Sequence, residues 1–306
     1  MKNLSVWLSA LRLRTLPLAA ASIIVGAGIA THQQVFNLPI FLLSLITALL
    51  LQMLSNLAND YGDAIHGTDD ENRVGPLRAM QTGEITPSEM KFAIILITVL
   101  TLLSGISLLT ISLSDDLFSW LIFSGLGVLA IVAAITYTMG KLPYGYRAMG
   151  DLAVFLFFGL LGVIGSFYLY DLSFDWSLLL PASSIGFLSA AVLNINNMRD
   201  VENDSKHNKT TLVVLFGRVT AFKYHLFLVI CAPLFASYYL YRLENTQIWQ
   251  YLFLLAMSPL IKSCLALSTA ISENQQSGSL FNEQLKNTAI STFVFALLFA
   301  LILIPQ

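Results

Sequence analysis

The segment NLPIFLLSLITALLLQMLSNLANDYGD, residues 37–63, is the clearest indication of the fold class of this chain. Its apolar part, residues 37–59, is long enough at about 1.5 Å per residue to cross the roughly 30 Å hydrocarbon layer of a membrane. The stretch ends on Asn59, Asp60 and Asp63. A carboxylate in lipid is unfavourable unless it is paired or bound to a metal. The stretch therefore predicts a membrane-spanning helix with a functional polar end.

The rest of the chain repeats this apolar character. Of its 306 residues 56% are hydrophobic and 11% charged, and the mean hydropathy is +0.74, which is typical of a polytopic membrane protein. We therefore predict an all-α protein. Nine segments are expected to span the membrane, at 15–31, 37–59, 90–113, 117–137, 150–170, 176–198, 213–240, 246–271 and 287–305.

Charge is distributed unevenly between the loops. The N-terminus and the loops after the second, fourth, sixth and eighth segments hold nearly all the basic residues, whereas the opposite loops are acidic. By the positive-inside rule the N-terminus is cytoplasmic. The formal net charge of −2 leaves no basic stripe for nucleic acid. Cys231 and Cys264 lie in apolar runs and are interpreted as packing residues.

A second acidic cluster matches the first and lies on the same side of the membrane. It follows the sixth segment as Asn197, Arg199, Asp200 and Asp204. Asn197, Asp200 and Asp204 are spaced by three and four residues and share one helix face. Asn56, Asp60 and Asp63 do the same in the first cluster, where Asn59 and Asp63 are also neighbours. The repetition suggests two related halves, roughly 1–140 and 141–306.

Clustered carboxylates repel one another unless a cation lies between them. Oxygen ligands without His or Cys are suited to Mg²⁺, whose coordination is often completed by substrate phosphates. Asp69, in the loop after the first cluster, could fold back over the site. The alternative is that both clusters are ordinary solvated helix ends, which explains one cluster better than it explains two on the same side.

Basic residues near the clusters indicate which ligand would bind together with the metal. Metal ions and cations together bind the oxygens of a diphosphate. Lys141 closes a Tyr137-x-x-x-Lys141 element, for which we favour a role in function. For Lys206 and Lys209 the choice between ligand and cytoplasmic charge stays open. The candidate cations are Arg73, Arg78, Lys141, Arg147 and Arg199.

These motifs resemble the UbiA superfamily of intramembrane aromatic prenyltransferases. Asn59…Asp63 and Asp200…Asp204 resemble its two aspartate-rich motifs, and Tyr137…Lys141 resembles its Tyr-x-x-x-Lys element. Further stretches are similar to the branch that prenylates 1,4-dihydroxy-2-naphthoate: RLRTLP at 12–17, NLANDYGD at 56–63, RVGPLR at 73–78 and GD at 150–151. One departure is Gly67, which stands where the superfamily commonly has a third carboxylate, so Asp69 is expected to supply that ligand.

The resemblance implies a single prenyltransferase domain over residues 1–306. Nine helices would surround a central cavity in a bacterial inner membrane, with cytoplasmic loops over the site. Mg²⁺ and a polyprenyl diphosphate would bind there, an allylic cation would form, and the naphthoate ring would attack it with loss of CO₂. The implied catalytic residues are Asp63, Asp200, Asp204 and Lys141. The implied metal ligands are Asn59, Asp60, Asp63, Asp69, Asp200 and Asp204. The implied substrate-binding residues are Arg14, Asn56, Arg73, Arg78, Tyr137, Lys141, Arg147, Asn197 and Arg199.

Other functions fit less of the sequence. The same chemistry with another acceptor, such as 4-hydroxybenzoate, would differ at a few pocket residues that the motifs do not identify. A cation-coupled transporter would place ionisable groups near the membrane midplane, whereas these acids lie at helix ends. A non-catalytic membrane scaffold gives no reason for two matched aspartate clusters. For Arg14, an acceptor contact and a membrane-edge anchor are equally compatible with the sequence.

Overall fold

The computed structural model describes residues 4–68, 74–243, 247–273 and 277–304. Within these ranges the chain is helical, and nine helical spans are long and apolar enough to cross a membrane. The predicted all-α, multi-span membrane protein is therefore confirmed.

Several spans contain more than one helical piece. The first combines α1 (Leu4–Ala10), a short turn η1 (Leu13–Thr15) and α2 (Leu16–His32). The fifth combines α6 (Gly150–Val154), a π-helical stretch η3 (Phe155–Gly165) and α7 (Ser166–Asp171). The remaining elements are α3 (Leu38–Ile65), α4 (Pro87–Ser112), α5 (Leu117–Thr136), η2 (Tyr144–Tyr146), η4 (Trp176–Leu178), α8 (Leu179–Lys206), α9 (Leu212–Arg242), η5 (Ile248–Ala256), α10 (Met257–Ser272) and α11 (Gly278–Ile302).

The main differences from the predicted boundaries concern the polar clusters. Helix α3 continues beyond residue 59 to Ile65, and α8 continues beyond residue 198 to Lys206. Both aspartate clusters thus lie within regular helix. Their spacing predicted that each cluster occupies one face of a helix, and the ion pairs described below allow the polar side chains to be buried there. Helix α11 likewise begins at Gly278, before the predicted residue 287.

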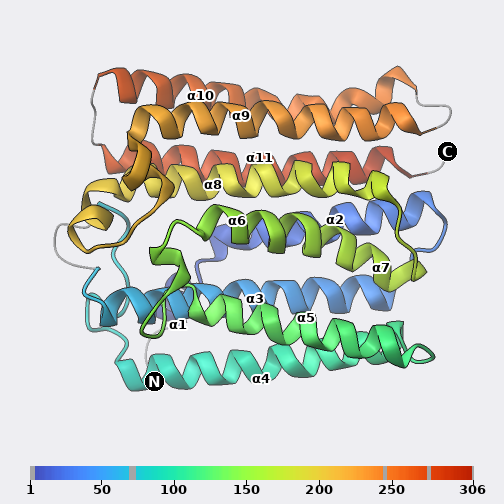
Figure 1. Ribbon diagram of the computed structural model, residues 1–306, viewed down its shortest axis with the longest axis horizontal. Coiled ribbons are helices and arrows are strands. Elements are labelled where there is room, and N and C mark those ends of the chain that lie inside the picture. Colours follow the sequence, from blue (N-terminus) through green and yellow to red (C-terminus); the bar gives the residue numbers. More distant parts are fainter. Residues whose placement is uncertain (1–3, 69–73, 244–246, 274–276, 305–306) are drawn as a thin grey trace.

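The helices run nearly parallel and form layers (Figure 1). Helix α8 packs against α9, α11 and η3, and α2 packs against α11 and α3. Helices α3, α4 and α5 form the opposite side of the bundle. Large apolar side chains are exposed on the outward faces of α4, α5 and α9, including Phe92, Phe118 and Phe216. In a membrane-spanning bundle this surface faces lipid.

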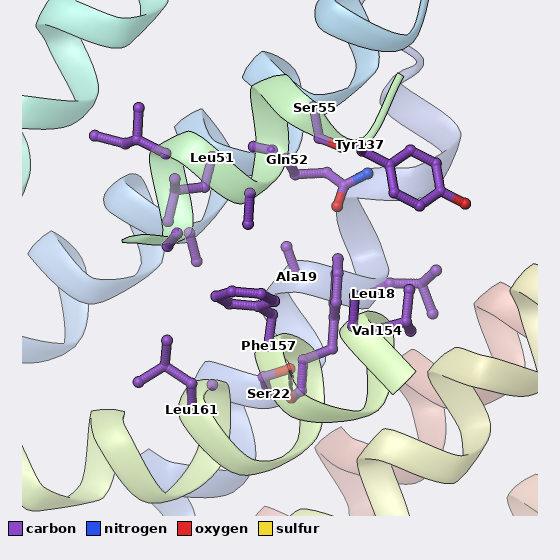
Figure 2. Close-up of a pocket in the computed structure, with 18 of the residues that line it drawn as sticks. Leu18, Ala19, Ser22, Leu51, Gln52, Ser55, Tyr137, Val154, Phe157 and Leu161 are labelled. Carbon is purple, nitrogen blue, oxygen red and sulfur yellow. Dashed lines mark hydrogen bonds between the residues drawn. The ribbon is translucent and has the colours of Figure 1, made fainter. Parts of the chain in front are cut away.

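A cavity of about 560 Å³ lies between α2, α3, α4, α5, η3 and α8. Figure 2 shows part of its wall, with Leu51, Gln52 and Ser55 on one side and Leu18, Ser22 and Phe157 on the other. The lining extends along α3 from Ser44 to Asp63, which is about 28 Å at 1.5 Å per residue. The cavity therefore runs through most of the thickness of a bilayer.

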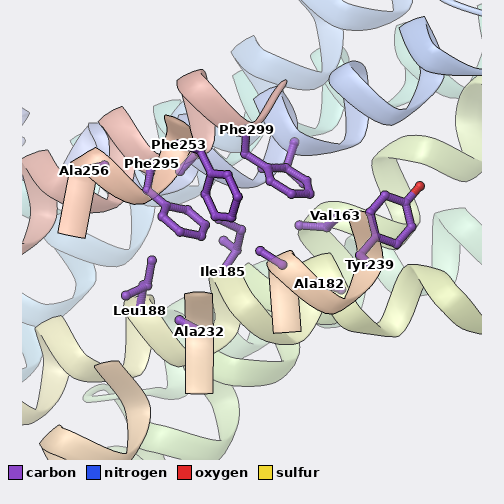
Figure 3. Packing of buried hydrophobic residues seen from close by; sticks show 14 of the residues in the cluster. Val163, Ala182, Ile185, Leu188, Ala232, Tyr239, Phe253, Ala256, Phe295 and Phe299 are labelled. Carbon is purple, nitrogen blue, oxygen red and sulfur yellow. The ribbon is translucent and has the colours of Figure 1, made fainter. Parts of the chain in front are cut away.

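The part of the bundle formed by η5, α9 and α11 has an aromatic core, which we call the aromatic end. Phe253, Phe295 and Phe299 are fully buried together with Tyr239, as Figure 3 shows. The Phe253 ring meets the Phe295 and Phe299 rings edge-on, with centroids 5.1 and 5.4 Å away. This geometry is favourable for aromatic pairs. The cluster joins η5, α9 and α11 where the cavity is absent among the described residues.

Candidate active site

Asp63, near the end of α3, is the centre of a hydrogen-bonded cluster at one end of the cavity. Arg78 donates to its Oδ2 over 2.7 Å, and the Tyr146 hydroxyl donates to its Oδ1 over 2.8 Å. The side chain is buried. Asp63 and Arg78 both line the cavity. A buried carboxylate held by two donors from loops after α3 and α5 has a fixed position before any ligand arrives.

Lys209 connects the two aspartate clusters. Its Nζ lies 3.4 Å from Asp204 Oδ1 and 4.0 Å from Asp63 Oδ1. It also lies over the Tyr146 ring, 5.4 Å from the centroid. Lys209 is only 8% exposed and lines the cavity. Lys209 therefore brings Asp63 of the first cluster and Asp204 of the second to one ammonium group, and the Mg²⁺ site expected between the clusters stays a prediction.

The charge of Lys209 is maintained by these carboxylates. Burial opposes the charge, but the attraction of Asp63 and Asp204 outweighs burial and raises the pKa of Lys209 above its ordinary value. Burial, together with the charge of Asp63, also raises the pKa of Tyr146. Tyr146 therefore remains a neutral hydroxyl that can donate to Asp63 at physiological pH.

The other two aspartates are also paired. Asp60 contacts Arg12 and lies 3.5 Å from Arg78 Nε. Asp200 is held in a bidentate contact by its neighbour Arg199, through hydrogen bonds of 2.7 and 2.6 Å. Arg199 donates further to Asn282 on α11. Asp60 and Asp200 therefore face their own guanidinium partners, and neither contributes to the cavity lining formed by the described residues.

Asn59 and Tyr137 lie where α3 and the end of α5 touch. The Asn59 side-chain oxygen accepts from the Thr138 hydroxyl over 3.2 Å. This contact depends on Gly62, because a Cβ there would lie 2.6 Å from backbone atoms of Thr138. The Tyr137 ring lines the cavity and packs against Tyr144, with centroids 5.3 Å apart. Asn59 and Tyr137 are thus fixed by the packing of one helix pair.

Asn56 belongs to a separate polar network one turn below Asn59. Its amide nitrogen donates to the Leu11 carbonyl over 2.9 Å and to the Thr15 hydroxyl over 3.0 Å. Its oxygen accepts from the amide of Gln52 over 3.3 Å. Arg14 precedes Thr15 in the chain and lines the same cavity. Asn56 therefore anchors the N-terminal segment that carries Arg14.

The structure brings together only some of the predicted site residues. Arg14, Asn56, Asn59, Asp63, Arg78, Tyr137, Asn197 and Arg199 line the cavity. Lys141 and Arg147 are exposed in the loop after α5 and lie outside the lining formed by the described residues. Asp69 and Arg73 lie outside the described residues, so the proposed loop ligand stays a prediction.

Three residues of the site were not assigned to it from sequence: Lys209, Tyr146 and Arg12. Lys209 follows Asp204 closely in the chain, which is the signal that could have favoured it over Lys141. Tyr146 contacts the Thr68 hydroxyl at 2.6 Å as well as Asp63. No spacing rule connects residues 63, 146 and 209, because they meet through helix packing alone.

The donor set is compatible with a hard divalent cation. Among the described residues no three His, Cys, Asp or Glu side chains converge into a ready-made metal site. Asp63 and Asp204 nevertheless approach the same ammonium group, and Asp204 Oδ2 is buried without a hydrogen-bond partner in the described part of the chain. A buried carboxylate oxygen without a partner is unfavourable. These oxygens are of the type that Mg²⁺ prefers.

Known proteins are similar to this chain in sequence and in fold. A model described as the UbiA prenyltransferase family matches residues 19–281. The 1,4-dihydroxy-2-naphthoate octaprenyltransferase of Escherichia coli K12 is 50% identical over 260 residues, covering 84% of this chain and 82% of that protein. The protein of the same name from Mycobacterium tuberculosis H37Rv is 39% identical over 219 residues, covering 71% and 72%.

Two solved structures show the same architecture. A UbiA homolog from Aeropyrum pernix K1 matches with a TM-score of 0.62 at 17% identity, covering 92% of this chain and 96% of that chain. A UbiA homolog from Archaeoglobus fulgidus bound to GPP and Mg²⁺ matches with a TM-score of 0.59 at 18% identity, covering 95% and 98%. At these identities the likeness establishes a shared fold.

Proposed function

This chain belongs to the UbiA prenyltransferase family, and from this premise we propose that it transfers a polyprenyl group from polyprenyl diphosphate to 1,4-dihydroxy-2-naphthoate. Diphosphate and CO₂ are released, and the product is a demethylmenaquinol of menaquinone biosynthesis. Relatives that are 50% and 46% identical to this chain carry the name of this activity. The acceptor 4-hydroxybenzoate is the alternative substrate, and no observation on the site favours it.

The observation that carries the proposal is the form of the cavity. Its lining holds Asp63, Arg78 and Lys209 at one end and Leu109, Trp120 and other apolar side chains at the far end. A polyprenyl diphosphate has the same division, with an anionic head and a long apolar tail. A membrane-embedded site matches such a substrate because lipid and apolar helix faces can hold the tail while charged groups hold the head.

We assign binding of the diphosphate to Lys209 and Arg78. Both cations line the cavity and both contact Asp63. Their charges favour departure of the diphosphate when the allylic C–O bond breaks. Asp63, Asp200, Asp204 and Asn59 are the proposed holders of Mg²⁺. When bound, Mg²⁺ would neutralise phosphate oxygens as a Lewis acid. Asp60 and Asp69 remain proposed ligands, and Lys141, Arg73 and Arg147 remain proposed contacts from the loops.

The walls of the cavity have a second role. Once the C–O bond has broken, the allylic cation must meet the aromatic ring before it meets water. Leu18, Phe157 and Tyr137 line the region beside the charged end. Apolar and aromatic walls exclude water, and ring faces stabilise a cation. Arg14 is the proposed partner of the acceptor carboxylate before it leaves as CO₂.

The proposed location is the bacterial inner membrane, with the charged end of the cavity at the cytoplasmic face. Support comes from the loops. The loops and helix ends on this side include Lys141, Arg147, Lys206 and Lys209, while those on the other side include Asp115, Asp116, Asp171 and Asp175. The asymmetry is the one that the positive-inside rule associates with a cytoplasmic face.

The decisive experiment supplies the purified full-length protein in detergent or nanodiscs with polyprenyl diphosphate and Mg²⁺. Separate reactions contain 1,4-dihydroxy-2-naphthoate or 4-hydroxybenzoate. We expect a prenylated, decarboxylated naphthoquinol, one released diphosphate per product, and no turnover of the benzoate. EDTA should abolish the reaction and added Mg²⁺ should restore it. Absence of product with every acceptor from protein that is folded and monodisperse would reject the proposal. Turnover of the benzoate alone would select the alternative acceptor.

A further inference from the structure

Gln52 offers a fixed, unused hydrogen-bond acceptor in the cavity wall. Its amide nitrogen donates to the Thr15 hydroxyl over 3.2 Å and to the Asn56 oxygen over 3.3 Å. Its oxygen is buried and has no hydrogen-bond partner among the described residues. Figure 2 shows the amide extending into the cavity beside Tyr137. Buried polar atoms in native proteins generally have partners, so an orphan oxygen at a cavity wall calls for a ligand.

The orientation of this amide is determined by its neighbours. Thr15 donates its own hydroxyl proton to the Arg12 carbonyl, and the Asn56 nitrogen donates to Leu11 and Thr15. Asn56 therefore presents only its oxygen to Gln52, and Thr15 can only accept from it. Rotating the Gln52 amide by half a turn would bring two acceptors together. The nitrogen must face this network, and the oxygen must face away from it.

The position of Gln52 determines which part of a substrate it can meet. It lies one helical turn from Asn56 on the cavity face of α3, on the apolar side of the charged cluster. Its partner Thr15 follows Arg14 directly, and Arg14 also lines the cavity. Gln52 thus stands between the groups suited to a diphosphate and the leucine-rich part of the wall. An aromatic ring must occupy this region if it is to attack the first carbon of the prenyl chain.

The need for a hydrogen-bond donor limits which ligand group can bind the Gln52 oxygen. A carbonyl oxygen needs a hydrogen-bond donor. The ionised diphosphate and carboxylate have no donor, and neither does the prenyl chain. The ring hydroxyls of the acceptor are donors. We infer that Gln52 recognises a hydroxyl group of the aromatic acceptor by accepting a hydrogen bond from it. This inference rests on the proposed function and deepens it, because it assigns a residue to acceptor recognition.

The test compares three acids as ligands of the full-length protein without the prenyl donor. They are 1,4-dihydroxy-2-naphthoate, 1-hydroxy-2-naphthoate and 4-hydroxy-2-naphthoate, and their Kd values are measured by calorimetry. We expect wild type to bind the dihydroxy acid about tenfold more tightly than one of the monohydroxy acids, the size of one hydrogen bond. Gln52→Met keeps the length of the side chain and removes the amide. It should abolish this discrimination.

Two controls separate recognition from damage. The Kd for polyprenyl diphosphate should change less than about twofold in Gln52→Met, which reports that the site is still assembled. Gln33→Met, at the exposed end of α2, should leave all Kd values unchanged. Discrimination that persists in Gln52→Met overturns the inference. Equal Kd values of wild type for all three acids also overturn the inference, and this result does not depend on whether the variant folds. It would mean that the Gln52 oxygen binds only water. Failure of the proposed function is a different outcome, namely no product from wild type with the donor present.

Discussion

The charged end of the cavity and the aromatic end of the bundle bury side chains of opposite kinds. At the charged end the buried Asp63 and Asp204 pair with Arg78 and Lys209. At the aromatic end Phe253 and its neighbours pack without a single ion pair among the described residues. Burial of charge requires a partner in a defined geometry, whereas burial of rings requires matched volume. Substitutions at the first end should therefore affect catalysis, and substitutions at the second should affect stability.

The largest expected effect on activity is at Asp63. Asp63→Ala removes an acid that contacts Arg78, Tyr146 and Lys209, and kcat should fall by on the order of 10²–10³-fold because charge stabilisation during diphosphate departure is lost. The measurement is prenyl transfer by the purified variant. Glu202→Ala is the matched control on α8, since Glu202 is partly exposed and pairs with Arg218 outside the cavity lining. It should retain activity within about twofold. An equal loss in both variants would show that the comparison is wrong.

A smaller effect is expected at Lys209. Lys209→Met removes the cation between the two clusters, and kcat/KM for polyprenyl diphosphate should fall about 10–100-fold, as for other charge-assisted contacts to phosphate. Lys206→Met is the control, because Lys206 is exposed on the last turn of α8. Lys209→Arg keeps a charge and should recover part of the loss. If Lys206→Met and Lys141→Met lower kcat/KM while Lys209→Met does not, then the exposed lysines, and not Lys209, bind the diphosphate.

The smallest effect on activity is expected at Phe253. Phe253→Ala leaves a void in the aromatic end and should lower the free energy of unfolding by about 3–5 kcal/mol, with kcat at low temperature within about twofold of wild type. Thermal unfolding in detergent and prenyl transfer at 10–15 °C, a range chosen to lie about 30 °C or more below typical mesophile midpoints, give the two readouts. Phe92→Ala, on the exposed face of α4, should change neither the free energy of unfolding nor kcat. A large loss of kcat in Phe253→Ala would mean that the two ends are coupled.

Much of the fold and part of the site could be predicted from sequence. Among the described residues hydropathy identified the nine spans. The helix face predicted for Asn56, Asp60 and Asp63 lines the cavity at Asn56 and Asp63, whereas Asp60 lies outside the lining and pairs with Arg12 and Arg78. These features are local, so a local pattern contains them. The apolar segments end before α3 and α8 do, because each helix continues through its polar cluster. The kinship of residues 1–140 and 141–306 stays a prediction.

The contacts of Lys209 could not be predicted in this way. Its ammonium meets Asp63 and Tyr146 because the end of α8, the end of α3 and the turn η2 pack together. Lys141 has the more suggestive sequence context but is exposed. Whether Lys141 or Lys209 lines the cavity depends on the path of the backbone in three dimensions. The same holds for the Gln52 side chain, since its nitrogen donates to Thr15, 37 residues earlier in the chain, and its oxygen is left without a partner among the described residues.

The pairing of the aspartates has a consequence for how the protein is made. Asp60 is neutralised by Arg12 and Arg78, and Asp200 by Arg199. Asp204 is neutralised by Lys209, also a near neighbour in the chain. Each cluster thus leaves the ribosome together with its own counter-charges, so it can enter the membrane as an electrically balanced segment at a lower cost than bare carboxylates. The 4.0 Å approach of Lys209 to Asp63 joins the two clusters, so it requires that both segments have been synthesised. The ion pairs that balance these segments for insertion therefore involve the residues that we propose for catalysis.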